Sequence, residues 1–319
     1  MKDGFIKAAA ATPELRVADV KFNTEESIKC IKEAAENGAK LITLPELGLT
    51  SYTCGDLFLQ ASLIRLAEHE LLRLAEATEN LDILSVVGLP VSNNGKLYNC
   101  AAFIKDGEIL GFVPKSNLPN YSEFYEARHF NTIDGNTEIL FGGRLIPMGT
   151  KLIFSAENMN GFSVAAEICE DLWTAAPPSC EHTKNGAVII INQSASDEVI
   201  GKSDWRRKMI EVHSSKAVCA YIYADAGEGE STTDMTFSGN NLIFELGTKL
   251  SEAPLFSNKI IYADIDTEKI LQERRRVTTF KNGNDAGYRH IYFKTEPTET
   301  RLTRSFEMKP FVPSDETKL

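Results

Sequence analysis

The sequence predicts a layered α/β protein with mixed sheets, and three observations support this fold class. Short apolar runs alternate with amphipathic stretches along the whole chain. Some of the apolar runs are joined by tight turns, whereas helical segments separate others, so antiparallel and parallel strand pairs are both expected. The content of 43% hydrophobic and 25% charged residues is ordinary for a globular protein.

The first part of the chain is expected to begin with a strand over residues 5–11 and a helix capped by Asn23. Glu26 stands three residues after that cap, and Asn37-Gly38 is a typical helix end. Asn93-Asn94-Gly95 and Asp106-Gly107 are hairpin turns. The other elements expected up to residue 113 are a helix over 63–77 and strands over 41–44, 83–91, 98–104 and 109–113.

The second part is expected to continue the same alternation. Its predicted strands cover residues 151–154, 162–168, 187–191, 220–224, 242–245 and 260–265, and a helix covers 203–218. A length of 319 residues suggests two domains at about 150 residues each, but single α/β domains of 250 or more residues occur. We interpret residues 1–290 as one domain and residues 291–319, with little periodicity, as a linker.

Charge and cysteine content exclude several classes of partner and fold. The chain has 34 Lys and Arg against 45 Asp and Glu, a net charge of −11 that disfavours nucleic acid and anionic membranes as partners. No export signal or membrane span is recognised, so a cytoplasmic protein with reduced thiols is expected. Six cysteines are too few for a disulfide scaffold. Cys180 and His182 lack a second ligand pair, so no metal site is expected.

Two predicted strands run into a proline that a charged residue follows. Leu44-Pro45-Glu46-Leu47 places a carboxylate among apolar residues, which suits a general base. Val113-Pro114-Lys115 places a lysine that could stabilise an anion. Taken alone, both patterns are more typical of solvent-exposed side chains at strand ends.

A third strand end carries Cys169. Alternation along residues 162–168 predicts that Cys169 shares a face with Ser163 and Glu167. The neighbouring Glu170 and Asp171 would raise the pKa of its thiol, so a nucleophilic cysteine here needs a nearby base or cation. Taken alone, one cysteine among six is more typical of a small buried apolar residue.

Together the three strand ends suit acyl transfer. Glu46 would take the thiol proton of Cys169, and Lys115 would stabilise the oxyanion that forms on an attacked amide. No Ser-His-Asp triad, Cys-His pair or phosphate-binding glycine loop is recognised.

The blocks LPELGLTSYTCGDLF (44–58), VPKSNLPNYSEFYEARHF (113–130) and EICEDLW (167–173) resemble the three catalytic blocks of the nitrilase, or carbon–nitrogen hydrolase, superfamily. INQSASDEVIGKSDWRR (191–207) and YADAGEGESTTDMTFSGN (223–240) are similar to its branch of N-terminal glutaminase domains in glutamine-dependent NAD synthetases. The resemblance covers nearly the whole chain and implies a four-layer α-β-β-α sandwich.

The resemblance also implies a role for individual residues. Glu46 would be the base, Lys115 the oxyanion-stabilising residue and Cys169 the nucleophile that forms a γ-glutamyl thioester. Glu126 would position the lysine and the acyl group. The backbone N–H of Glu170 would be a second oxyanion donor, and the remaining glutamine-binding positions would be Tyr121, Trp173, Ser196 and Lys202.

The resemblance further implies a partner domain. The chain lacks the S-G-G-x-D-S loop of the ATP-dependent synthetase domain, and FVPSDETKL (311–319) is similar to the start of the connection to it. No cofactor is therefore expected on this chain, and ATP, Mg²⁺ and deamido-NAD are expected only on the synthetase domain. The family often assembles through this domain, so a homo-oligomer is expected. The alternatives are a free-standing amidase for another small amide and a dormant scaffold domain.

Overall fold

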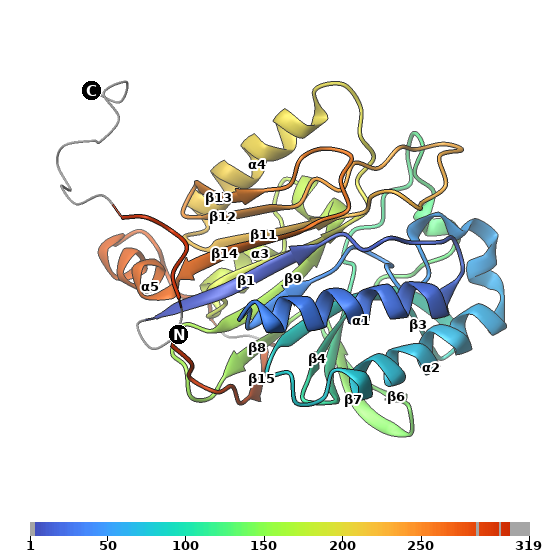
Figure 1. Cartoon of the computed structure of the whole chain (residues 1–319), viewed down its shortest axis with the longest axis horizontal. Coiled ribbons are helices and arrows are strands. Elements are labelled where there is room, and N and C mark those ends of the chain that lie inside the picture. The colour runs from blue at the N-terminus through green and yellow to red at the C-terminus, as the bar shows by residue number, and fades with distance from the viewer. Residues whose placement is uncertain (1–3, 285–286, 300, 307–319) are drawn as a thin grey trace.

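The computed structural model describes residues 4–284, 287–299 and 301–306. Within them, an eight-stranded sheet A has the strand order β14-β1-β2-β3-β4-β5-β7-β6 and a seven-stranded sheet B has the order β13-β12-β11-β10-β9-β8-β15 (Figure 1). Sheet A consists of β1 (Phe5–Ala11), β2 (Leu41–Thr43), β3 (Leu84–Asn93), β4 (Lys96–Lys105), β5 (Glu108–Pro114), β6 (Asn136–Phe141), β7 (Arg144–Gly149) and β14 (Ile260–Asp266). Sheet B consists of β8 (Leu152–Ala156), β9 (Ser163–Ile168), β10 (Ile189–Ser194), β11 (Ala220–Asp225), β12 (Leu242–Glu245), β13 (Thr248–Glu252) and β15 (Arg289–Phe293).

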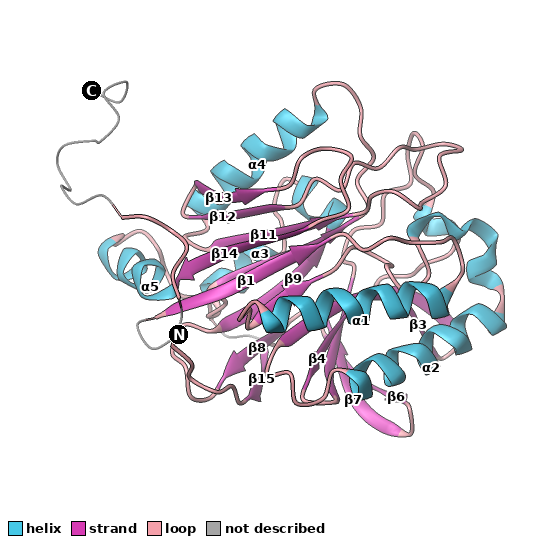
Figure 2. Cartoon of the chain, in the orientation of Figure 1, coloured by secondary structure: helices cyan, strands magenta, loops and turns pink. Residues whose placement is uncertain are grey.

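Helices cover the outer faces of the two sheets (Figure 2). The α-helices are α1 (Val20–Glu36), α2 (Ala61–Ala77), α3 (Ser179–Lys184), α4 (Lys202–Lys216) and α5 (Thr267–Arg276), and the 3₁₀ helices are η1 (Tyr52–Leu59), η2 (Glu126–Arg128) and η3 (Cys169–Trp173). Helices α1 and α2 pack on sheet A, and α3 and α4 pack on sheet B. Both sheets contain parallel and antiparallel pairs. The predicted mixed four-layer α-β-β-α sandwich is confirmed.

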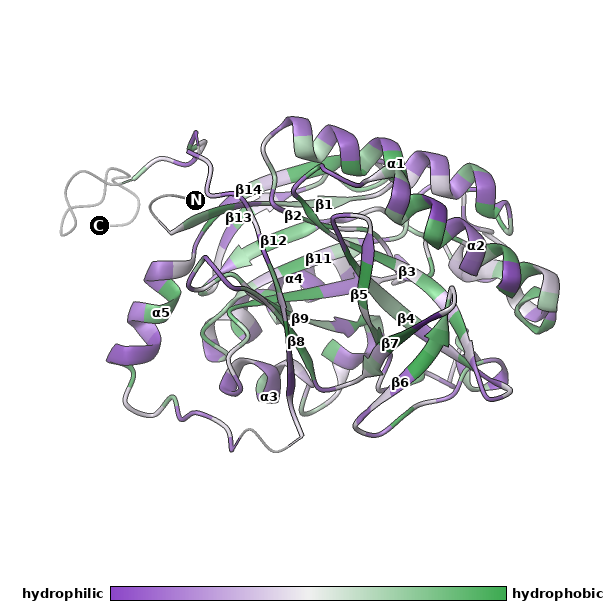
Figure 3. Cartoon of the chain, turned by 90° about the horizontal axis from the view of Figure 1, so that it is seen from below, coloured by the Kyte–Doolittle hydropathy of each residue, from purple (hydrophilic) through white to green (hydrophobic). Residues whose placement is uncertain are grey.

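Three apolar clusters match the three interfaces between the layers. The central cluster joins inward-facing residues of both sheets, such as Phe103 and Phe154, whose rings stack with centroids 3.7 Å apart. The other two clusters lie between each sheet and its helices. Apolar and polar residues alternate along α1 and α2 (Figure 3), as expected for helices that bury one face.

The start of α1 corrects a prediction. The helix begins at Val20, and the Asp19 side chain accepts a hydrogen bond from the backbone N–H of Phe22. Asn23 is instead buried inside the helix, where its amide exchanges hydrogen bonds of 2.8 and 2.9 Å with the backbone of Arg16. Aspartate and asparagine are both good caps, so local sequence did not distinguish the two positions.

The structure contains elements that the sequence pattern did not reveal. The β6–β7 hairpin, β13, β15 and α3 were not predicted, because their residues show little alternation. Strand β15 pairs in parallel with β8 and crosses the predicted domain boundary at residue 290. The linker assignment of the residues beyond it stays a prediction, and residues 307–319 lie outside the described ranges.

The packing of the two sheets brings distant strand ends together. Glu46 follows β2, Lys115 follows β5 and Cys169 follows β9. Gln193 of β10 crosses between the sheets, since its amide donates to the carbonyl oxygens of Leu44 at 2.8 Å and Val86 at 3.0 Å. The strand ends of sheet A are thereby tied to those of sheet B.

We expect Gly88→Ala to destabilise the fold beside this region. A Cβ at Gly88 in β3 would lie 2.4 Å from the Leu47 nitrogen and 2.5 Å from the Pro45 oxygen, so the backbone around Glu46 would have to move. Such overpacking costs roughly 1–3 kcal/mol, which urea unfolding measures. Gly95→Ala is the comparison variant: that glycine has open space around it but φ +74°, so its loss of stability reports left-handed backbone strain without overpacking. An unchanged free energy of unfolding for Gly88→Ala would contradict the close approach.

Candidate active site

Glu46 is held by donors from three parts of the chain. Its side chain is fully buried, and Oε1 accepts hydrogen bonds from Asn99 Nδ2 at 2.6 Å and Lys115 Nζ at 2.7 Å. Oε2 accepts the backbone N–H of Ala195 at 2.9 Å. These contacts fix the orientation of a carboxyl group inside the protein, as a positioned acid–base group requires.

Lys115 lies between two carboxyl groups. Its buried Nζ contacts Glu46 Oε1 and, at 2.6 Å, Glu126 Oε1. Burial lowers the pKa of Lys115, but Glu126 and Glu46 outweigh this effect, and the pKa ends well above its usual range. Lys115 therefore remains an ammonium ion, a fixed positive charge in an apolar setting.

Glu126 completes the charged cluster from η2. Its Oε1 also accepts the Tyr52 hydroxyl at 2.8 Å, while its buried Oε2 has no hydrogen-bond partner among the described residues. Burial raises the pKa of Glu126 to about 7, with Lys115 opposing and Glu46 adding to the rise. The unpaired oxygen leaves room for a donor from a bound molecule.

Cys169 occupies a strained turn between β9 and η3. Its φ is 45°, in the left-handed region that non-glycine residues seldom adopt. The backbone N–H of Cys169 donates to Asn192 Oδ1 at 3.0 Å, which ties the turn to β10. A left-handed residue at a strand end is a feature of strained functional turns.

The side-chain face predicted for Cys169 is wrong. The residue packs in the central cluster with Val164 and Ile168, between the sheets, and not on the face of Glu167. Alternation ends at Ile168, because the left-handed conformation of the next residue breaks the two-residue period. The turn thus directs the thiol toward the space between the sheets.

The charges around the thiol also differ from the prediction. Burial and then Glu46 raise the pKa of Cys169 far above its usual range, while Lys115 and a hydrogen bond with Ser194 lower it. The sequence had suggested Glu170 and Asp171 as the principal causes. The thiol is therefore protonated at rest, with Glu46 as a nearby acceptor.

Asp171 has a structural role. Its carboxyl group accepts backbone N–H groups of Ile168 at 2.9 Å and Asn117 at 2.8 Å, and also the Asn117 side-chain amide at 2.8 Å. Burial raises the pKa of Asp171 to about 6. The side chain joins the cysteine turn to the segment that follows Lys115.

Four of the predicted substrate-binding residues form two pairs of contacts beside η3. Tyr121 donates its hydroxyl to Glu170 at 2.9 Å, and Tyr121 is 54% exposed. The Lys202 ammonium lies 5.6 Å from the centre of the Trp173 ring and forms an ion pair with Asp197. These side chains border the cysteine turn, as a binding surface would.

The fifth, Ser196, is buried and lies after β10. Its backbone N–H donates to Asp225 at 2.9 Å, and its hydroxyl accepts from Arg206 at 3.4 Å. Arg206 is fully buried and also bonds Glu198. The segment that carries Ser196 is therefore held in place by Arg206 of α4.

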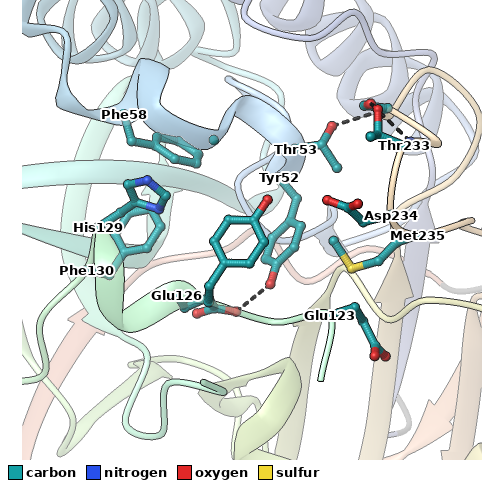
Figure 4. Close-up of a pocket in the computed structure, with 13 residues that line it drawn as sticks. Tyr52, Thr53, Phe58, Glu123, Glu126, His129, Phe130, Thr233, Asp234 and Met235 are labelled. Atoms are coloured by element: carbon teal, nitrogen blue, oxygen red, sulfur yellow. Dashed lines mark hydrogen bonds between the residues drawn. The ribbon is translucent and has the colours of Figure 1, made fainter. Parts of the chain in front are cut away.

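A pocket of about 220 Å³ adjoins the charged cluster on the side of Tyr52 and Glu126 (Figure 4). Its polar lining includes Glu123, His129 and Asp234. Cys169 does not line it, so this pocket is not the cavity around the Cys169 thiol.

Sequence reasoning missed Asn99, Tyr52 and Asn192, which bond Glu46, Glu126 and Cys169 respectively. Tyr52 lies inside the first resembling block, which is the only signal that could have identified it. Within the described ranges, no group of three or more His, Cys, Asp or Glu side chains could hold a metal ion. None of the helices in those ranges combines the length and apolar character of a membrane span.

Comparisons with known proteins show the family to which the chain belongs. Residues 7–275 match the carbon-nitrogen hydrolase family. The glutamine-dependent NAD(+) synthetase of Mycobacterium tuberculosis strain H37Rv is 38% identical over 329 residues, covering 99% of this chain and 48% of its own. That of Thermotoga maritima is 28% identical, covering 88% of this chain and 46% of its own. The chain spans about half the length of these curated relatives.

Solved structures show the same architecture. The crystal structure of a glutamine-dependent NAD(+) synthetase from Cytophaga hutchinsonii is similar with a TM-score of 0.73 and 29% identity, over 82% of this chain and 43% of that one. An amidase from Nesterenkonia sp. has a TM-score of 0.65 at 17% identity, over 86% of this chain and 97% of its own. The second likeness concerns the fold alone.

Proposed function

Because the chain belongs to the carbon–nitrogen hydrolase family, we propose that it hydrolyses the side-chain amide of glutamine and supplies the ammonia for glutamine-dependent NAD synthesis. The observation that carries this proposal is the buried cluster in which Lys115 bridges Glu46 and Glu126 beside the thiol of Cys169. The similarity of the relatives named glutamine-dependent NAD(+) synthetase supports glutamine as the substrate.

In the proposed first half-reaction, Glu46 accepts the thiol proton as the sulfur of Cys169 attacks the amide carbon of glutamine. The developing oxyanion is stabilised by Lys115 and by the backbone N–H of Glu170. As the second residue of η3, Glu170 has no acceptor within that helix for its N–H. Collapse breaks the C–N bond, Glu46 returns the proton to the leaving nitrogen, and ammonia departs.

The second half-reaction hydrolyses the γ-glutamyl thioester. Glu46 takes a proton from water, the hydroxide attacks the thioester carbonyl, and the C–S bond breaks. The proton returns to the sulfur, which restores the thiol and releases glutamate. Glu126 keeps Lys115 in place, and its unpaired Oε2 is a suitable acceptor for the substrate amide N–H.

We place the α-amino and α-carboxylate groups of glutamine against Tyr121, Trp173, Ser196 and Lys202. The ammonium of Lys202 and the half-buried Trp173 ring suit a small zwitterion with a carboxylate. The paired Tyr121 and Glu170 add polar contacts at the exposed side. The proposal extends to a cytoplasmic homo-oligomer in which a synthetase domain binds ATP, Mg²⁺ and deamido-NAD and uses the ammonia.

Incubation with glutamine is expected to release equal amounts of glutamate and ammonia. A glutamine-analogue electrophile should add its acyl mass to Cys169, as peptide mapping by mass spectrometry would show. A panel of other ω-amides is the matched comparison, and preferential turnover of another amide would replace glutamine as the substrate. Calorimetry with ATP should give no binding heat, because we place the nucleotide site on the synthetase domain.

A further inference from the structure

The long connection between β11 and β12 contains a buried carboxyl group outside the charged cluster. Glu230 belongs to the segment GEGESTTD (227–234) and is 7% exposed. One of its oxygens accepts the backbone N–H of Tyr52 at 2.7 Å. The other accepts the backbone N–H of Thr53 at 3.0 Å and the Thr53 hydroxyl at 2.5 Å. Glu230 thus directs both oxygens at one turn of the chain.

That turn is the start of η1, where the residue at the N-cap position does not cap the helix with its own side chain. Ser51 precedes the helix with φ 75°, and its side chain makes no capping hydrogen bond. The first N–H groups of a helix have no intrahelical acceptors, so Tyr52 and Thr53 need an outside one. Glu230 supplies this acceptor from a segment that lies 178 positions further along the chain. A carboxyl group in this position acts as a distant N-cap.

Tyr52 links this cap to the charged cluster. Its phenol donates to Glu126 Oε1 at 2.8 Å (Figure 4), and the same oxygen accepts Lys115 Nζ at 2.6 Å. The Tyr52 ring also packs edge-on against Phe237, with centroids 6.2 Å apart. The β11–β12 connection therefore holds Tyr52 at its backbone through Glu230 and at its ring through Phe237.

We propose that Glu230 is a positioning residue for the reaction, which acts through Tyr52 to hold Glu126 and the Lys115 ammonium in register with Cys169. The inference rests on the proposed function for its kinetic consequence only. Its structural part is the chain of contacts from Glu230 through Tyr52 to the carboxyl group of Glu126, and the effect of Glu230 on the pKa of Glu126 can be measured without turnover.

Because Tyr52 joins Glu230 to Glu126, the pKa of Glu126 reports whether Glu230 holds Tyr52 in place. The titratable and charged groups facing Glu126 are Lys115 after β5, Glu46 after β2, Cys169 after β9 and Tyr52 on η1. The adjoining pocket is also lined by Glu123, Tyr125, His129 and Asp234. Burial raises the pKa of Glu126 to about 7, and the Tyr52 hydrogen bond opposes that rise. Weakening this bond favours the protonated form, so the pKa of Glu126 must increase.

The experiment replaces Glu230 by glutamine in the full chain and follows the side-chain carboxyl ¹³C signal of Glu126 through a pH titration. This signal is assigned as the one that is missing from the spectrum of Glu126→Gln. Since a glutamine has one acceptor oxygen for three donors, the turn should loosen and the pKa of Glu126 should rise by about 0.5–1 unit. The acid limb of glutamine turnover should move to higher pH by the same amount. Glu228→Gln, at an exposed position of the same segment, is the matched control.

Two further variants test whether Glu230 acts on Glu126 through Tyr52 and Thr53. Tyr52→Phe removes the phenol while Glu230 stays, so it should raise the pKa of Glu126 too, and the double variant should show no added shift. Thr53→Val removes one donor, so it should give a smaller shift in the same direction even where Glu230→Gln fails to fold. An unmoved Glu126 signal in folded Glu230→Gln or Thr53→Val, or additive shifts, would overturn the proposal. A parent chain inert toward glutamine would overturn the proposed function instead.

Discussion

Cys169→Ala is expected to abolish ammonia release from glutamine, by roughly 10³-fold or more, because no other group can form the thioester. The variant should fold, since the change removes one atom from a side chain that is already small. We expect a loss of about 1 kcal/mol in the free energy of unfolding. An ammonia assay on purified protein, together with urea unfolding, measures both effects.

Cys219→Ala is the matched control for that experiment. Cys219 is another buried cysteine, and it packs on the outer side of sheet B away from the charged cluster. The control should show a similar loss of stability and full turnover. Substantial glutamine hydrolysis by Cys169→Ala would eliminate this residue as the nucleophile.

Glu46→Gln is expected to reduce glutamine turnover by about 10²-fold or more, the usual contribution of a positioned base. The amide cannot take the thiol proton. It also brings N–H donors to a place where Asn99, Lys115 and Ala195 already donate, so one contact must be lost. With one of its two carboxylate partners removed, Lys115 should have a lower pKa than in the parent chain.

Turnover measured across a pH series checks the role of Glu46, with Glu36→Gln at the exposed end of α1 as the control. The parent and the control should share one pH profile. A profile of Glu46→Gln that matches theirs in height and shape would show that another group accepts the proton.

The order and type of the main elements could be predicted because apolar periodicity reports which face of a strand or helix is buried. Strands β9, β10 and β11 with helix α4 followed from that pattern. The edge strands β6, β13 and β15 could not be found in this way. In β13, for example, the burial pattern shows no residue that is fully enclosed, so selection for apolar residues is weak there.

The positions of the candidate site residues could be predicted from the sequence, but their side-chain directions and contacts could not. Glu46, Lys115 and Cys169 stand at strand ends, and strand ends can be located from sequence. The face of Cys169 was predicted wrongly, because one left-handed residue reverses the alternation and no glycine marks the position. Contacts such as Tyr52 with Glu126 join positions 74 residues apart, and only the packing of the two sheets determines them.

The protonated state of the Cys169 thiol has a consequence for its chemical durability. Peroxides attack thiolates, and sensor cysteines are oxidised readily because their thiols are acidic and accessible. Cys169 is 6% exposed, and burial with the nearby carboxyl group of Glu46 keeps its sulfur uncharged. Burial and the neighbouring carboxyl group therefore protect the sulfur from oxidation by peroxides.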